Sequence, residues 1–418
     1  MSTNKVSEKV IAVGVVLADQ TRRVAEEHLD ELEQLIESAG GVVVAKILAK
    51  RNAPDAATWI GSGKAEEIKR LAGKERATLV VFDDDLSPAQ TRNLERIIET
   101  KVIDRSALIL DIFASRAKSR EARTQVELAQ LEYMLPRLTR QWSHLERQAG
   151  GIGTRGVGET QLEIDRRIVR NRIGQLKDEL ARIERTRETQ RKSRGGVFTV
   201  ALVGYTNAGK STLFNQLTGG SALAVDKLFA TLDAKSQRAS FAMPRQTVII
   251  DTVGFVRKLP HHLVASFRST MEEAVAADLV LHVIDGSHPQ HEDQRAVGEE
   301  VLRDLGIPAD RVIEVYNKSD LVHGPRDRAT SLSALSGHGI EQLVDAIRER
   351  ELAGGDVLEL EIPHAQSRAL AKLHELAEVY EEHSGDQMTR VTAWIPRNAI
   401  HQFDKFSASN LLKRAKVS

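Results

Sequence analysis

The first 115 residues alternate short apolar runs with amphipathic segments. The apolar runs are VIAVGVVLA at 10–18, then GVVVAKILAK and TLVVFDDD. Between them, TRRVAEEHLDELEQLIESAG, GKAEEIKRLAGKE and SPAQTRNLERIIE repeat apolar positions at helical spacing, and KVIDRSALILDIFA is expected to pass from strand to helix. Alternating strands and helices predict a parallel or mixed sheet with crossover helices. We therefore expect residues 1–115 to form an α/β domain.

Between residues 116 and 196 the strand pattern disappears and apolar residues recur at spacings of three and four, which is typical of a coiled-coil seam. Two such arms flank one glycine-rich stretch, so we expect residues 116–196 to form an antiparallel helical hairpin. Pro136 lacks a backbone N–H and is expected to kink the first arm. The seam residues are Leu128, Leu131, Leu135, Leu138, Trp142 and Leu145 in the first arm, and Leu162, Val169, Ile173, Leu176, Leu180 and Ile183 in the second.

The glycine-rich stretch AGGIGTRGVGE lies at the expected tip of this hairpin. Gly151, Gly153 and Gly156 have the G-x-G-x-x-G spacing of a dinucleotide-binding loop, but no predicted strand precedes them, so the required strand–loop–helix context is missing. Glycine lets the backbone approach a ligand closely, and Arg155 adds a fixed charge suited to RNA. We expect Gly153 and Arg155 to contact RNA; the alternative is a turn that only reverses the chain.

The strongest chemical signal is the segment VFTVALVGYTNAGKSTLFNQLTG, which reads as a buried strand, a loop and a helix. Gly204, Gly209, Lys210 and Ser211 match G-x-x-x-x-G-K-[ST] in that context. Backbone N–H groups of such a loop bind phosphates, the lysine contacts the β- and γ-phosphates, and the hydroxyl binds Mg²⁺. The predicted phosphate-binding residues are Gly204, Tyr205, Thr206, Asn207, Ala208, Gly209, Lys210, Ser211 and Thr212.

Two further segments are predicted to surround the γ-phosphate. The strand QTVIIDTVGF ends in Asp251, Thr252, Val253 and Gly254, which places a carboxylate near the metal through water and a glycine N–H toward the γ-phosphate. Upstream, KLFATLDAKSQ holds Thr231, a candidate to close over the metal. The predicted metal-binding residues are Ser211, Thr231 and, through water, Asp251, and the predicted catalytic residues are Lys210, Thr231 and Gly254.

The choice of base is predicted from VIEVYNKSD, which carries Asn317, Lys318 and Asp320 after a strand. An aspartate carboxylate can accept two N–H bonds from guanine, whereas adenine offers neither donor. A desolvated, unpaired carboxylate costs on the order of 1–3 kcal/mol or more, so GTP should be preferred over ATP. Ser333, Ala334 and Leu335 are expected to touch the guanine edge. Residues 197–354 are therefore expected to form a GTP-binding domain.

These residues resemble the translation-associated GTPases allied to Obg and Era, and within them the HflX family. The specific motifs are GGIGTRGVGETQLEIDRR, WIGSGKAEEI and VIDRSALILDIFASRAKSREARTQVELAQLEYMLPRL, together with GYTNAGKSTLFN. The resemblance implies a P-loop GTPase that binds the large ribosomal subunit and its rRNA, is stimulated there, and splits or rescues ribosomes under stress. It also implies that Asn207 helps to hold K⁺ against the phosphates.

One residue departs from the familiar small-GTPase pattern. Phe255 follows Gly254, where many switch GTPases carry a glutamine that orients the attacking water. An apolar ring cannot do this, so unassisted hydrolysis is expected to be slow.

Composition narrows the remaining possibilities. Lys+Arg and Asp+Glu both number 59, so net charge gives no sign of a nucleic-acid partner, although Arg166 and Arg170 on the second hairpin arm are candidates for rRNA contact. The absence of cysteine excludes disulfides, thiolate zinc sites and cysteine nucleophiles. No run approaches the ~20 apolar residues of a membrane helix. We expect a cytoplasmic monomer without a membrane span, with peripheral membrane association as an alternative.

The last part of the chain, residues 355–418, is expected to form a small α/β domain from the strand VLELEIP, the helix SRALAKLHELAEVYEEH and a second strand. GSGK at 61–64 is interpreted as a turn before a helix or an RNA contact rather than a second nucleotide site. Two alternative functions remain open from the sequence. One is a ribosome-assembly GTPase, and the other is an RNA-binding or ATP-dependent RNA-remodelling protein in which the nucleotide is secondary.

Overall fold

The computed structural model describes residues 8–18, 20–138, 161–192, 197–220, 228–229, 234–241, 246–258, 268–322 and 330–407. The chain forms two compact units. The first consists of Met1–Ile183 together with Val225–Asp233 and Val256–Arg268, and the second of Glu184–Ala224, Ala234–Phe255 and Ser269–Ser418. Two short segments from the middle of the chain therefore fold with its N-terminal part.

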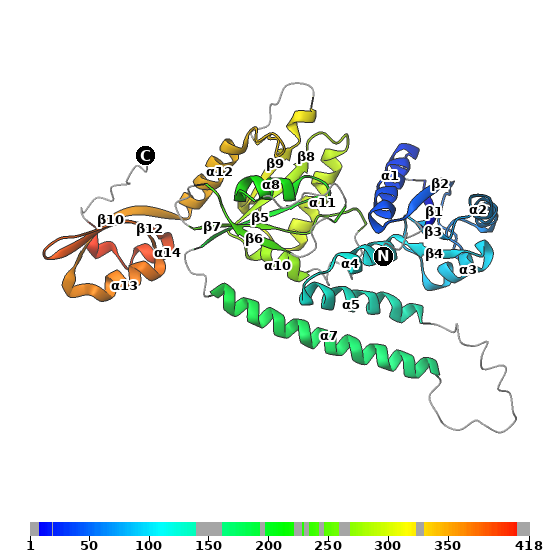
Figure 1. Cartoon of the computed structure of the whole chain (residues 1–418), viewed down its shortest axis with the longest axis horizontal. Coiled ribbons are helices and arrows are strands. Elements are labelled where there is room, and N and C mark those ends of the chain that lie inside the picture. Colours follow the sequence, from blue (N-terminus) through cyan, green and yellow to red (C-terminus); the bar gives the residue numbers. More distant parts are fainter. Residues whose placement is uncertain are drawn as a thin grey trace, which may run out of the picture. The chain divides into compact units, whose positions relative to one another are not determined.

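The first unit contains a four-stranded parallel sheet in the order β2-β1-β3-β4. Its apolar runs become the strands because they are buried between helices, as the sequence pattern predicts (Figure 1). Helix α1 begins after Thr21, whose hydroxyl accepts from the Val24 N–H, and ends at Gly40. The elements are β1 (Lys9–Val16), α1 (Arg22–Ala39), β2 (Val42–Lys50), α2 (Ser62–Glu75), β3 (Leu79–Phe82), α3 (Pro88–Ile98), β4 (Lys101–Asp104) and α4 (Arg105–Arg116).

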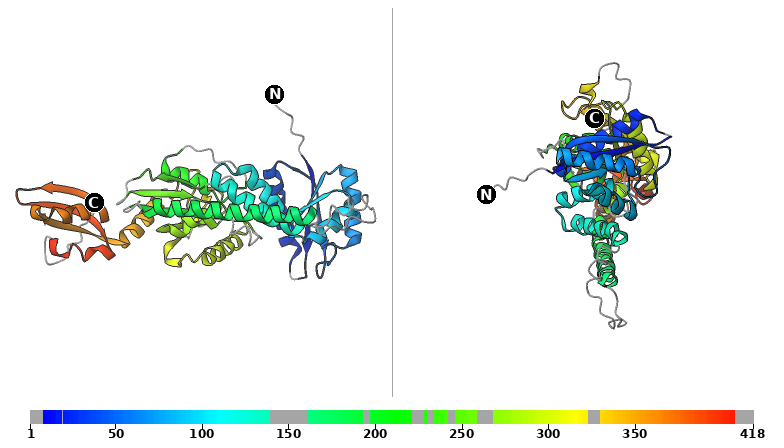
Figure 2. Two further views of the ribbon diagram at one scale, coloured as in Figure 1. Left: turned by 90° about the horizontal axis from the view of Figure 1, so that it is seen from below. Right: turned by 90° about the vertical axis from the view of Figure 1, so that its right-hand side faces the viewer.

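The hairpin arms are α5 (Arg120–Met134), with the 3-10 turn η1 (Leu135–Arg137), and α7 (Gln161–Lys192). Figure 2 shows α7 as one long, unbroken helix. Ion pairs join the arms, including Arg172 with Glu127 at 2.7 Å. The expected kink at Pro136 is instead the end of the first helix, because proline removes a helical hydrogen bond and α5 tightens into η1.

The second unit contains a five-stranded sheet in the order β6-β7-β5-β8-β9, in which only β6 is antiparallel to its neighbour. The central strand β5 is buried along nearly its whole length. The prediction of an α/β fold with a mostly parallel sheet is confirmed. The elements are β5 (Phe198–Gly204), α8 (Lys210–Thr218), β6 (Lys235–Arg238), β7 (Thr247–Asp251), α10 (Arg268–Ala276), β8 (Leu279–Asp285), α11 (His291–Asp304), η2 (Ala309–Arg311), β9 (Val312–Asn317), η3 (Ser319–Leu321) and α12 (Ile340–Ala353).

The C-terminal part of the second unit is a three-stranded antiparallel sheet in the order β10-β12-β11. The prediction of one helix over residues 367–383 is wrong in its second half. Helix α13 ends at Leu376, and Glu378–Ser384 form strand β11. Val379 and Tyr380 are residue types that favour extended backbone. The segment is held in that conformation by antiparallel pairing with β12. The elements are β10 (Gly355–Pro363), η4 (His364–Gln366), α13 (Ser367–Leu376), β11 (Glu378–Ser384), β12 (Met388–Pro396), α14 (Arg397–Ile400) and η5 (Asp404–Phe406).

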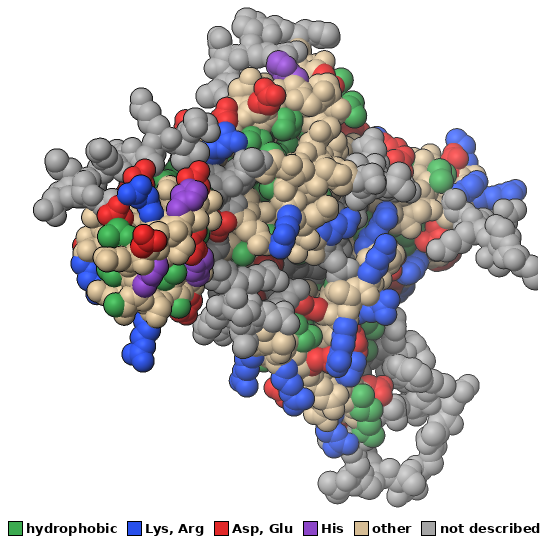
Figure 3. All heavy atoms as spheres, turned by 60° about the vertical axis from the view of Figure 1, so that its left-hand side comes forward, with side chains coloured by type: hydrophobic (Ala, Val, Ile, Leu, Met, Phe, Trp, Pro, Cys, Tyr) green, Lys and Arg blue, Asp and Glu red, His purple; other side chains and the backbone are tan. Residues whose placement is uncertain are grey.

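The surface carries charges of both signs. On the face shown in Figure 3, lysine and arginine side chains are interspersed with aspartate and glutamate. Among the helices that the structure describes, none is both long enough and apolar enough to cross a membrane.

One titratable group lies in the core of the second unit. His282 on β8 is 1% exposed. Burial lowers its pKa to about 4; Glu314 opposes this shift, while Arg295 and Lys210 add to it. The native state therefore holds this imidazole neutral across a pH range in which the unfolded chain would protonate it.

We expect acid to weaken the second unit through His282. Between its unfolded pKa near 6.5 and its native pKa of about 4, the unfolded state binds more protons, so the stabilisation is complete above pH 6.5 and falls toward pH 4. The loss should reach up to about 1.4 kcal/mol per pH unit. Calorimetric unfolding from pH 7.5 to 4.5 should show a flatter pH dependence for His282→Gln than for wild type, and an unchanged one for the exposed control His338→Gln. Identical slopes in all three proteins would contradict this account.

Candidate nucleotide-binding site

The loop between β5 and α8 is shaped by close backbone contacts. Helix α8 begins at Lys210, and Gly209 precedes it in the left-handed region with φ 88°. A Cβ on Gly209 would lie 2.2 Å from the Asn317 Nδ2, so only glycine fits. Asn207 also adopts a left-handed φ, 62°, and its side chain is exposed. The sequence pattern G-x-x-x-x-G-K-S thus produces a compact loop between a buried strand and a helix N-terminus.

The Lys210 ammonium is folded back over this loop. Its Nζ donates to the carbonyl oxygens of Gly204 at 3.0 Å and Tyr205 at 2.8 Å. The side chain is 7% exposed, and desolvation lowers its pKa to about 8, although the charge of Asp251 opposes that shift. A desolvated cation held by neutral carbonyl groups favours an approaching anion, which is the chemistry expected of a phosphate-binding lysine.

Two oxygen-bearing side chains meet beside Lys210. The Ser211 hydroxyl, at the start of α8, donates to the Asp251 carboxylate at 2.8 Å. Strand β7 positions Asp251 opposite Leu202 of β5, and the Thr252 hydroxyl donates to the Leu202 carbonyl at 2.7 Å. Hydroxyl and carboxylate oxygens are hard donors of the kind that Mg²⁺ prefers. The side chains present therefore fit a magnesium ion in this position.

The segment after β7 lies directly on the phosphate-binding loop. The Phe255 N–H donates to the Gly204 carbonyl at 2.9 Å, and the Thr206 N–H donates to the Phe255 carbonyl at 2.7 Å. A Cβ on Gly254 would lie 2.8 Å from both the Lys210 Nζ and the Thr206 Cα. Glycine is therefore required at 254 because two elements of the site approach each other there.

Asn317 ties the residues predicted to recognise the base to the predicted phosphate-binding loop. Its Nδ2 donates to the Ala208 carbonyl at 2.9 Å, and its Oδ1 accepts from the Ala334 N–H at 2.9 Å. Lys318 adopts a left-handed φ of 62° and pairs with Asp285 at 2.7 Å. The Asp320 side chain is exposed, as a carboxylate that reads a base edge must be.

The structure brings together the predicted residues that it describes around the β5–α8 loop. Ser333 is buried and Leu335 is 78% exposed, so the residues 333–335 present both a fixed backbone and an open apolar side chain. Thr231, Gly153 and Arg155 lie outside the residues that the structure describes. On α7, the Arg166 Nε donates to the Leu138 carbonyl at 3.1 Å, while Arg170 is exposed.

Two residues beside the predicted switch segments were not predicted from the sequence. Phe229, two residues before Thr231, packs on Phe113 of α4, and Lys258, shortly after Gly254, pairs with Asp83 and Asp84. Nothing in the local pattern marks either residue. The only available signal was the run of three aspartates at 83–85 directly after a buried strand, where parallel sheets commonly bind ligands.

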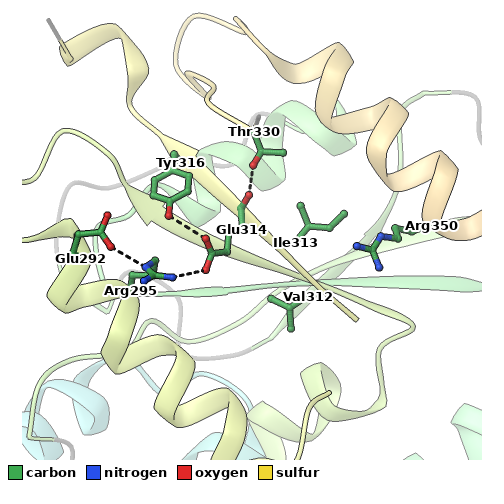
Figure 4. Close-up of a pocket in the computed structure, with 8 residues that line it drawn as sticks. All are labelled: Glu292, Arg295, Val312, Ile313, Glu314, Tyr316, Thr330 and Arg350. Carbon is green, nitrogen blue, oxygen red and sulfur yellow. Dashed lines mark hydrogen bonds and ion pairs between the residues drawn. The ribbon is translucent and has the colours of Figure 1, made fainter. Parts of the chain in front are cut away.

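A cavity of about 600 Å³ beside β9 contains none of the predicted nucleotide-binding residues. Figure 4 shows that Arg295 points toward Glu292 and Glu314, which it contacts at 3.0 Å and 3.2 Å, while Arg350 lies apart from them. Its lining residues are Glu292, Arg295, Val312, Ile313, Glu314, Tyr316, Thr330 and Arg350. Hydrogen bonds to Glu314 and Glu292 raise the pKa of Arg295 above its usual range, so its charge is held in a local ion-pair network.

Comparisons with known proteins agree with the geometry. Three family models match in succession: the GTP-binding GTPase N-terminal region at 26–114, the GTP-binding GTPase middle region at 116–194, and a 50S ribosome-binding GTPase at 199–318. The GTPase HflX of Lacrimispora saccharolytica is 48% identical over 82% of this chain and 83% of its own. The GTPase HflX of Escherichia coli is 46% identical over 85% of this chain and 86% of its own.

A solved structure is also similar, a GTP-binding protein from the hyperthermophilic archaeon Sulfolobus solfataricus in complex with GDP. It is 25% identical, with a TM-score of 0.43, and the match covers 82% of this chain and 98% of that chain. The family models and the two relatives agree with the resemblance that the motifs indicate. The chain belongs to the GTPase HflX family.

Proposed function

We propose that this GTPase is a nucleotide-controlled factor of the large ribosomal subunit, which binds rRNA in its GTP state and releases it after hydrolysis, splitting or rescuing stalled ribosomes under stress. The observation that carries the nucleotide part is the Asn317 side chain, which joins the phosphate-binding loop to the residues expected to read guanine. The ribosomal part is supported by the match to a family described as a 50S ribosome-binding GTPase, and by the pair of helices α5 and α7, of which α7 carries basic residues predicted to contact rRNA.

The proposed reaction is in-line attack of water on the γ-phosphate. Lys210 balances charge on the β- and γ-phosphates, and the Gly254 N–H donates to the γ-phosphate. Ser211 and, through water, Asp251 would hold Mg²⁺ together with Thr231, and the ion supplies charge neutralisation between the β- and γ-oxygens when bound. Phe255 is 3% exposed and its ring has no polar atom to orient water, so turnover is slow until a partner contributes the missing group.

Asp320 is the residue that sets base specificity in this proposal. Asp320→Asn replaces an acceptor by a donor, so GTP affinity should fall by at least about a hundredfold while affinity for xanthosine triphosphate, whose C2 carries a carbonyl, should rise. Titration with fluorescent nucleotides measures both. The matched control is Asp310→Asn, an exposed carboxyl in the same unit that should leave both affinities unchanged. Unaltered GTP affinity in Asp320→Asn would place guanine recognition elsewhere.

We further propose that K⁺ binds beside the phosphates through Asn207. Replacing K⁺ by Na⁺ should lower the GTP turnover of the wild type, since the larger ion fits the site that the asparagine completes. Asn207→Gly retains the left-handed backbone and removes only the side-chain oxygen, so its turnover should be equally low in both salts. A wild-type rate that is the same in K⁺ and Na⁺ would exclude this role.

Ribosome binding can be tested by pelleting the protein with purified large subunits. We expect co-sedimentation with a non-hydrolysable GTP analogue and release with GDP, because the γ-phosphate is expected to change the conformation of the switch segments. The double variant Arg155→Ala with Gly153→Pro should co-sediment less with the large subunit, and so should Arg170→Ala alone. Arg22→Ala on α1 should co-sediment as the wild type does. Equal co-sedimentation with the GTP analogue and with GDP would rule out the nucleotide switch. Preference for precursor particles over mature subunits would favour ribosome assembly.

A further inference from the structure

Lys258 lies shortly after the Gly254 segment in the chain but folds with the first unit. Its Nζ contacts the Asp83 Oδ2 at 2.8 Å and the Asp84 Oδ1 at 2.6 Å. The side chain of Lys258 is 34% exposed, while Asp83 is 4% and Asp84 19% exposed. These are partly buried ion pairs between residues about 175 positions apart, which is a different class of contact from a solvent-exposed surface pair.

The two carboxylates are held in place independently of Lys258. Asp83 follows β3 and accepts from the buried Arg105 at 2.7 Å, and Asp84 accepts from the Trp59 indole at 3.2 Å. They lie at the carboxyl end of a parallel sheet whose order reverses between β1 and β3, the usual place for a ligand in such folds. In this protein the ammonium of Lys258 occupies that place at the end of the sheet.

The electrostatics agree with a preformed cation site. Burial lowers the pKa of Lys258, but the charges of Asp83 and Asp84 and hydrogen bonds to both outweigh it, so the pKa is raised. The site therefore favours the charged ammonium over the neutral amine more strongly than water does.

The chain just before Lys258 lies against the predicted phosphate-binding loop. Thr206 donates its N–H to the Phe255 carbonyl, and Lys210 donates to two loop carbonyls with Gly254 packed against it. A bound γ-phosphate would compete for the Lys210 ammonium and for the loop N–H groups. Only Val256 and Arg257 separate Phe255, which is bonded to the loop, from Lys258 in the sequence.

The other predicted switch segment is anchored in the same unit. Phe229 is 2% exposed, and its ring meets that of Phe113 on α4 edge to face, with centroids 4.6 Å apart. Phe229 and Lys258, which are close in sequence to the two predicted switch motifs, thus each contact residues of the first unit.

We propose that Lys258, Asp83 and Asp84 form a nucleotide-sensitive latch that holds the Gly254 segment against the phosphate-binding loop and that opens when GTP binds. This inference rests on the proposed GTP switch. It adds that the carboxylates of Asp83 and Asp84 in the first unit are released from Lys258 when GTP binds. By linkage, contacts made only in the latched state oppose GTP binding, and GTP binding in turn frees the carboxylate site of the first unit.

The test compares affinities for GDP and for a non-hydrolysable GTP analogue in full-length variants. Lys258→Ala and Asp84→Asn each remove one side of the latch and spare Asp83, which also pairs with Arg105. Each should bind the GTP analogue roughly tenfold more tightly than wild type, within the range of measured couplings, and bind GDP unchanged. Lys258→Arg keeps the positive charge, so its affinity for the GTP analogue should be close to that of the wild type. Lys69→Ala, which removes an exposed lysine paired with Glu99, is the matched control and should change neither affinity.

The double variant Lys258→Ala with Asp84→Asn should gain no more than the larger single variant, because both changes break one interaction. Circular dichroism identifies any variant that is misfolded, and Lys258→Gln then replaces Lys258→Ala. Wild-type affinities in all variants, or additive gains in the double variant, would overturn the latch. A wild-type protein that fails to bind the GTP analogue would instead overturn the proposed function, so the two failures are distinguishable.

Discussion

The buried ammonium of Lys210 is the interaction on which the site depends. A charge that is 7% exposed is costly, and two loop carbonyls offset this cost only in part, as its pKa of about 8 indicates. The loop must therefore keep a tight shape to supply those carbonyls, which requires glycine at 209 beside Asn317 and glycine at 254 beside Lys210. A phosphate anion would complete the coordination of this cation, and the fold around it is arranged so that Asp251 and Asn317 reach the same place.

Much of the fold could be predicted from the sequence because its strands are local and strongly patterned. The runs that become β1, β3 and β5 are apolar and buried on both faces, and the loop before α8 follows a strand as the motif requires. The C-terminal helix was predicted too long because Val379 and Tyr380 are locally compatible with either a helix or a strand. Only pairing with β12, which is distant information, makes this segment a strand. The arms of the hairpin were predicted, but the first helix ends at Met134 rather than bending at Pro136.

The residues that the sequence could not reveal are those with distant partners. Lys258 and Asp84 are 174 positions apart, and neither belongs to a motif. Two basic residues of α7 also have partners that the sequence could not show. Lys177 pairs with Glu132 of α5 at 2.8 Å, and Arg166 bonds a backbone carbonyl. Charge counted along one helix therefore overstates what that helix offers to an external polyanion, because the neighbouring arm cannot be seen from local spacing.

The segments that interrupt the second unit set a limit on how strong any coupling can be. Residues of 225–233 and 256–268 fold with the first unit, yet they flank the motifs expected to respond to the γ-phosphate. If their contacts were much stronger than the differential affinity of GTP for the two states, the nucleotide could not move them. The two ion pairs of Lys258, whose own side chain is 34% exposed, and one aromatic pair are of the right order, since typical couplings between sites are about 1–3 kcal/mol. A fully buried pair such as Arg105 with Asp83 would be too strong to serve, and it is used instead to fix the carboxylate that Lys258 meets.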